Sequence, residues 1–124
     1  MKRWTYASNP TAGTTCVVTI PVAGNSRHVM EKLLVSQQNK TAAAYTSTLT
    51  IRDSSTGGTI LGQLAYFTGA AAANVDSLDT NVIGIKRVSS DTALVGAMVA
   101  HWAPPNSSVV QTIIAAGYTE EEPY

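Results

Sequence analysis

The chain has 124 residues, enough for one domain with a two-layer core and too few for two such domains. Only 13% of its residues are charged, against roughly 25% in soluble globular domains, and small uncharged residues make up the difference. Its eight basic and eight acidic residues cancel, and the basic ones are scattered along the chain. Composition therefore argues against self-repelling disorder, and also against direct binding of nucleic acid, which needs clustered cations.

The first residues, Met1–Tyr6, include two basic side chains but no apolar run behind them, so no secretory signal peptide is predicted. No segment approaches the roughly 20 consecutive apolar residues of a membrane-spanning helix. We expect a protein that is made in the cytoplasm, stays soluble and does not contact a membrane.

The N-terminal segment, residues 1–13, combines aromatic side chains with a closing Pro10–Gly13 turn, which predicts a short edge strand or arm. Residues 14–20 are rich in β-branched side chains and stop at Pro21, before a Gly-Asn pair. This pattern predicts a strand closed by a turn.

Residues 27–38 fit two structures. Val29, Met30, Leu33 and Leu34 recur at helical spacing behind a Ser26 that could cap a helix, yet the same residues fit a long strand. Local propensity slightly favours a helix, whereas the neighbouring segments favour a strand, and both remain open at this point.

Residues 45–53 alternate, with Thr at most positions of one face, which predicts a half-buried strand of an antiparallel sheet. Residues 54–58 supply a Gly-rich hairpin turn, and residues 59–67 return as the next strand, bent at Gly62.

The remaining chain predicts further short strands. A small-residue loop at 69–74 precedes them, and a turn at 79–81 and a Pro-rich break at 103–107 divide them. The predicted strands are 75–78, 82–88, a central strand within 93–102, and a last strand at 109–116 that closes on Gly117-Tyr118.

About eight strands separated by turns indicate an all-β fold, a single antiparallel β-sandwich or jelly-roll-like domain spanning residues 1–124. In this prediction residues 119–124 form an acidic C-terminal tail.

Chemically active patterns are missing from the sequence. Cys16 stands alone in an apolar strand, which leaves no disulfide partner, no multi-cysteine metal site and no favourable setting for a reactive thiolate. His28 and His101 lack metal-ligand spacing, so we expect structural histidines on strands. Asp53, Asp76, Asp79 and Asp91 all fall at predicted turns, where Asp accepts backbone hydrogen bonds. We therefore predict no enzyme activity, no cofactor and no metal.

Charged and aromatic residues gather near both chain ends, where one small core needs them least. They would suit a head-to-tail or arm-exchange contact between copies, whereas the alternative is that the charges are solvated termini and the aromatics plug the sandwich ends. As an assembly interface they predict that truncation at either end weakens assembly more than folding. The candidate interface is Lys2, Arg3, Trp4, Tyr6, Tyr118, Glu120, Glu121, Glu122 and Tyr124.

Three stretches, residues 19–29, residues 49–60 around the Gly57-Gly58 turn, and residues 113–118, resemble small β-sandwich virion proteins of tailed bacteriophages, particularly capsid decoration (cement) proteins. The resemblance implies a homotrimer on the outside of an icosahedral head, where it clamps neighbouring major capsid proteins and so is located in the virion. It also implies that Arg27, His28 and Val29 belong to a strand. The Pro104-Pro105 break and the acidic tail depart from the pattern of these proteins.

Two alternatives belong to other classes of protein. A lectin-like or receptor-binding module of a tail fibre or spike would hold a glycan in a loop such as 70–74 or 104–108, where Trp102 near Asn106 comes closest to a glycan site. A cupin-like enzyme would need two or three converging histidines with a carboxylate, and the chain has only two histidines, far apart.

Overall fold

The computed structural model describes residues 2–21, 26–39, 44–53, 56–68, 77–83, 88–89 and 97–121. Within these ranges every regular element is a strand, which confirms the predicted all-β class. The strands are β1 (Lys2–Ser8), β2 (Cys16–Ile20), β3 (Ser26–Asn39), β4 (Tyr45–Asp53), β5 (Ile60–Thr68), β6 (Ser77–Ile83), β7 (Val88–Ser89), β8 (Met98–Trp102) and β9 (Val109–Glu121).

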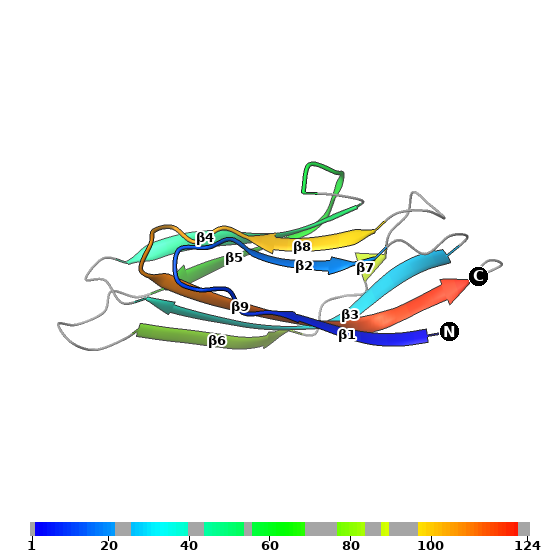
Figure 1. The fold of residues 1–124 in the computed structure, drawn as a ribbon, viewed down its shortest axis with the longest axis horizontal. Coiled ribbons are helices and arrows are strands. Elements are labelled where there is room, and N and C mark those ends of the chain that lie inside the picture. Colours follow the sequence, from blue (N-terminus) through cyan, green and yellow to red (C-terminus); the bar gives the residue numbers. More distant parts are fainter. Residues whose placement is uncertain are drawn as a thin grey trace.

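The strands form two antiparallel sheets that lie one above the other (Figure 1). One sheet has the order β1-β9-β3-β6, with the short β7 also paired to β3, and the other has the order β2-β8-β4-β5. Leaving β7 aside, the first strand pairs with the last, the second with the seventh, the third with the sixth, and the fourth with the fifth. This nested pairing is the strand order of a jelly roll.

Strand β4 shows how the sequence pattern produces the sandwich. Ser47, Leu49 and Ile51 are buried between the sheets, whereas Thr46 and Thr48 on the opposite face are exposed. The predicted half-buried strand is therefore confirmed, with the predicted bounds. The bend expected at Gly62 of β5 is also present, because the register with β4 slips by one residue between Gly62 and Ile60.

The segment that fitted both helix and strand is strand β3. Its register against β9 shifts at Glu31, so Glu31 is the extra residue of a β-bulge. Before the bulge Met30 points into the sandwich, and after it Leu33 does, three residues later. The bulge therefore produced the helix-like spacing of apolar residues, and sheet pairing overrode the local helix propensity.

Two predicted turns are wrong. Strand β6 runs through Asp79-Thr80-Asn81, where a break and a turn carboxylate were expected, because these residues pair with Val35–Gln37 of β3. Strand β9 continues past Gly117-Tyr118 to Glu121, paired with β3 throughout and with β1 as far as Thr119. The first three residues of the tail predicted for 119–124 are therefore strand. The predictions for 69–74, 75–76, 84–87 and 93–96 lie outside the described residues.

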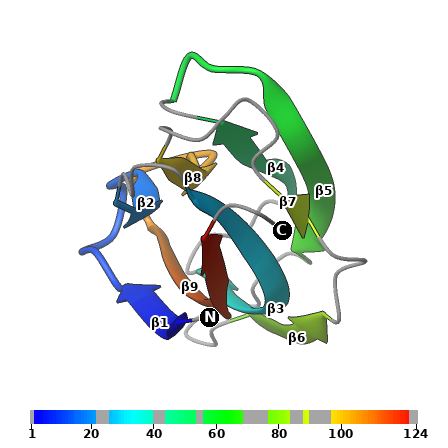
Figure 2. The same ribbon diagram turned by 90° about the vertical axis from the view of Figure 1, so that its right-hand side faces the viewer.

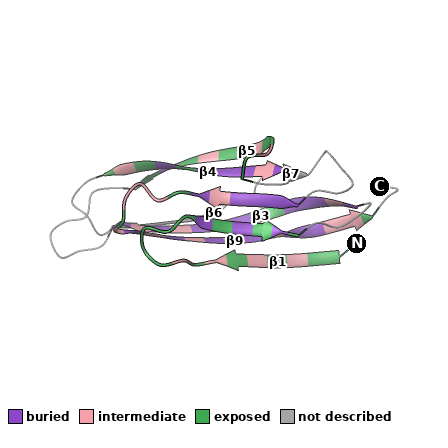
Figure 3. Ribbon diagram, turned by 45° about the horizontal axis from the view of Figure 1, so that its top comes forward, coloured by how far each residue is buried: buried purple, intermediate pink, exposed green. Residues whose placement is uncertain are grey.

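The core lies between the sheets around Trp102, Leu33, Leu49 and Met98, all fully buried. Figure 3 shows buried residues, in purple, along strands of both sheets. Cys16 belongs to the same cluster, and Trp4 and Tyr6 of β1 pack against it from the edge. The N-terminal strand is therefore part of the sandwich.

Candidate functional site

The structure places the described candidate interface residues, Glu121 included, on two neighbouring strands, β1 and β9. β1 pairs with β9 over its whole length, so Lys2 lies opposite Thr119 and Arg3 opposite Tyr118. β9 pairs in turn with β3, which places Glu120 opposite Arg27. The charges of the two chain ends, expected to meet between copies, thus lie at one end of one sheet within a single chain. Glu122 and Tyr124 lie outside the described residues.

At this end of the sheet, on the face toward the core, Trp4 packs β1 against the sandwich. Its indole N–H donates to the Thr119 hydroxyl at 3.1 Å, and its ring lies edge-on to His28. The ring also lies over Gly117, where an added Cβ would collide with the Val29 carbonyl oxygen and come within 2.9 Å of the indole. Gly117 is needed here for close packing.

His28 is buried behind Trp4 and hydrogen-bonded through both ring nitrogens. Nε2 lies 2.7 Å from the Pro21 carbonyl oxygen, which can only accept, so Nε2 carries the proton. Nδ1 then accepts from the Thr119 hydroxyl at 2.9 Å. Burial lowers the pKa of His28, while the Pro21 hydrogen bond and Asp53 act in the opposite direction. His28 is therefore a neutral structural residue that joins β3, β9 and the end of β2.

On the outer face at the same end of the sheet, charged side chains form ion pairs within the chain. Arg27 and Glu120 form a half-buried ion pair at 2.8 Å. Arg3 reaches across β9 to Glu31 at 3.2 Å, and its guanidinium also lies over the Tyr118 ring. These contacts occupy residues that the sequence had offered to a second copy.

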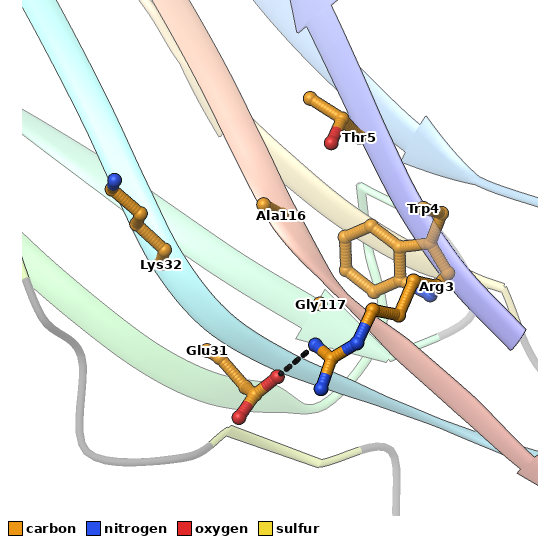
Figure 4. A pocket seen from close by; sticks show the side chains of 7 residues that line it. All are labelled: Arg3, Trp4, Thr5, Glu31, Lys32, Ala116 and Gly117. Atoms are coloured by element: carbon orange, nitrogen blue, oxygen red, sulfur yellow. Dashed lines mark hydrogen bonds and ion pairs between the residues drawn. The ribbon is translucent and has the colours of Figure 1, made fainter. Parts of the chain in front are cut away.

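The Arg3–Glu31 pair spans a shallow hollow of about 460 Å³ (Figure 4). Its floor is Ala116 and Gly117 of β9, and its sides come from β1 and β3. The small floor residues and the bulge at Glu31 create the hollow. Lys32 lines it too and has no ion-pair partner among the described residues.

The rest of the outer surface of this sheet is uncharged over its described side chains on β1, β3 and β9. Alternation and register place nine such residues there, half-buried on the inner strands and exposed on β1. We call them the neutral face: Thr5, Ala7, Leu34, Ser36, Gln38, Val110, Thr112, Ile114 and Ala116. A broad sheet surface of this kind is inexpensive to desolvate.

The outer surface of the four-stranded sheet holds His101. Arg52 donates from Nε to His101 Nε2 at 3.1 Å and from a terminal nitrogen to the Gly58 carbonyl at 2.8 Å. Because a guanidinium only donates, this ring nitrogen accepts. Burial lowers the pKa of His101, and the positive charge of Arg52 lowers it further.

The sequence analysis did not predict the network of buried polar side chains in the core. Trp102 donates its indole N–H to Ser47 at 2.8 Å, and Ser47 donates to Gln37 at 2.8 Å. The Gln111 amide lies 2.8 Å from Gln37, and turned over it would donate to the Trp102 carbonyl at the same distance. The network links β3 and β9 of one sheet to β4 and β8 of the other. Alternation alone could have located it, because Gln37 and Gln111 stand at inward positions.

In the described part of the chain, the observations that had suggested a glycan-binding module or a cupin-like metal enzyme find no support. Trp102 is fully buried and engaged with Ser47, so it cannot stack on a glycan in the 104–108 loop. His28 and His101 lie on different sheets, and no group of three His, Cys, Asp or Glu side chains there could hold a metal. The Cys16 thiol is buried, and burial raises its pKa.

Comparison with known proteins assigns no relative. No known protein family matches the chain, and no curated protein sequence matches it either. Among the described residues there is no helix long and apolar enough to cross a membrane.

Proposed function

We propose that this chain is a structural virion protein, a decoration protein that binds the outside of a tailed-bacteriophage head and strengthens contacts between major capsid proteins. The observation that carries the proposal is the neutral face, nine uncharged side chains on one sheet, bordered at one end by charged residues. A face of this kind can dock with little desolvation cost, and many copies on a symmetric shell make modest contacts add up.

The fold is compatible with this role without specifying it. Jelly rolls build capsid proteins, lectins and cupins alike, so the argument depends on the surface. The homotrimer that the resemblance implies is a separate expectation, and the binding proposal does not depend on it.

A binding experiment tests the proposal with shells assembled from the major capsid protein encoded in the same genome. The wild-type chain is expected to sediment with expanded shells and to raise the temperature at which they break. Leu34→Lys/Ile114→Lys adds two charges at paired positions of the neutral face and should weaken binding by about tenfold or more.

The control is Thr46→Lys/Thr48→Lys, which adds the same charges to exposed positions on the outer surface of the other sheet. It should bind like the wild type. If the double lysine variant fails to fold, the milder Ile114→Thr variant takes its place in the binding experiment. Absence of wild-type binding, or equal binding by all variants, would overturn the proposal.

A further inference from the structure

The described edge strands of the two sheets differ in how they are protected. The edges are β1, β6 and the two-residue β7 of one sheet and β2 and β5 of the other. β1 begins with Lys2 and Arg3, β6 contains Asp79, and β2 has only five residues before Pro21. Charge, shortness and proline are the means by which natural proteins keep edge strands from pairing with other chains.

Strand β5 lacks charge and proline throughout its nine residues, Ile60–Thr68. Among the described strands it is hydrogen-bonded to β4 alone, and its bulge at Leu61 is confined to its start. It approaches β6 and β7 of the other sheet without pairing with them. Figure 2 shows β5 at the outer margin of its sheet. The row of main-chain groups that does not face β4 is therefore a candidate for pairing.

The same strand carries the most exposed large hydrophobic side chains of the described residues. Phe67 is 65% exposed and Ile60 is 48% exposed, and they lie near opposite ends of β5. Single exposed hydrophobic residues are ordinary. Two of them on an edge strand without charge or proline indicate a surface that another chain covers.

We propose that β5 pairs with β5 of a second copy of this chain, antiparallel and about a two-fold axis at Leu64. The two four-stranded sheets then become one sheet of eight strands. Centred on the middle residue of β5, Ala65 lies across from Gln63. The bulge at Leu61 leaves Ile60 opposite Arg52 on the outer face, so Phe67 of one copy lies beside Ile60 of the other. Phe67 of each copy and Ile60 of the other copy thus cover part of each other's exposed surface.

The lack of charge favours a second copy over another partner. In an antiparallel pair of identical strands, a charge near the axis meets its own copy a few ångströms away, which destabilises pairing. A strand that pairs with itself must therefore be neutral near its middle, as β5 is. This inference is independent of binding to a shell, and it differs from a homotrimer, which a two-fold contact cannot close.

The test is the mass of the purified full chain by light scattering and sedimentation. We expect the wild type at twice the 13.0 kDa chain mass. Ala65→Lys places two lysines at diagonal positions across the axis, within reach of each other, and should raise the dissociation constant by about tenfold or more. The matched control is Thr48→Lys, because Thr48 is exposed and lies opposite Ala65 on β4 of the same chain. It should remain a dimer.

Charge complementation separates pairing from damage to the fold. Ala65→Glu alone should also be monomeric, whereas an equimolar mixture of Ala65→Lys and Ala65→Glu should restore the dimer. A wild-type monomer, a wild-type trimer, an unchanged Ala65→Lys dimer or a mixture that stays monomeric would each overturn the proposal. Loss of shell binding by a still dimeric chain would count against the proposed function and leave this inference standing.

Discussion

At the scale of single residues, His28 makes stability sensitive to pH. Its neutral ring donates to Pro21 and accepts from Thr119, and burial lowers its pKa below the ordinary value of 6.5. As the pH falls past that value the unfolded chain takes up this proton first, so the free energy of unfolding decreases. Above about pH 7.5 neither state is protonated at this site and the dependence vanishes.

We expect His28→Gln to flatten this dependence, because a glutamine amide can donate to Pro21 and accept from Thr119 without titrating. Urea unfolding between about pH 5.5 and 7.5 measures the slope, a window chosen to lie above the ordinary pKa of carboxyl groups. His101→Gln serves as the control, because the pKa of His101 is also lowered. This variant should lose only the part of the pH dependence that His101 contributes. A His28→Gln variant with the full wild-type slope would contradict the assignment.

At the scale of elements, the polar network joins β4 and β8 to the facing sheet through buried hydrogen bonds. Ser47→Ala removes the acceptor of the Trp102 indole N–H and a donor to Gln37, both inside the core. We expect a loss of about 1–3 kcal/mol in the free energy of unfolding, measured by urea titration.

The neighbouring Thr48→Ala is the natural comparison for that measurement. Thr48 is exposed on the outer surface, so its truncation should change stability by no more than about 0.5 kcal/mol. Equal stability of the two alanine variants would show that the network contributes nothing measurable.

Alternation along the chain predicted strands wherever a strand follows the plain period of two. Residues 45–53 are such a case, and their bounds came out as expected. The bulge at Glu31 and the passage of β6 through Asp79 depend on a partner strand, and no local pattern contains that information. Gly117 resembles a turn residue in sequence, whereas its actual role is to leave room for Trp4, a contact across more than a hundred residues.

The candidate interface stays a prediction, and its arrangement in space depends on strand pairing that the sequence does not contain. Aromatic and charged residues near the chain ends could be picked out from composition, but only the β1–β9 pairing shows that they meet inside one chain. Neither exposed residue of β5, Phe67 or Ile60, drew attention in the sequence, because an inward and an outward apolar residue look alike before the register is known.

At the scale of the whole molecule, the nested strand pairing places the first strand, β1, at the edge of a sheet and next to the last strand, β9. Because β1 covers one edge of β9 and supplies Trp4 and Tyr6 to the core, the fold depends on residues near the N-terminus. This changes the expectation for truncation, since the segment that would serve as an exchangeable arm is also a structural strand.

We therefore expect deletion of residues 1–9 to destabilise the fold itself. The deletion removes the packing of Trp4 and Tyr6 and the hydrogen bond to Thr119, a loss of about 3 kcal/mol or more. Domains of this size are stable by about 5–15 kcal/mol, so the truncated chain should unfold at clearly lower urea concentration. Arg3→Ser is the control, because its exposed ion pair with Glu31 should be worth no more than about 1 kcal/mol. Unfolding of the truncated chain at the wild-type urea concentration would instead make β1 a dispensable arm, available for exchange between copies.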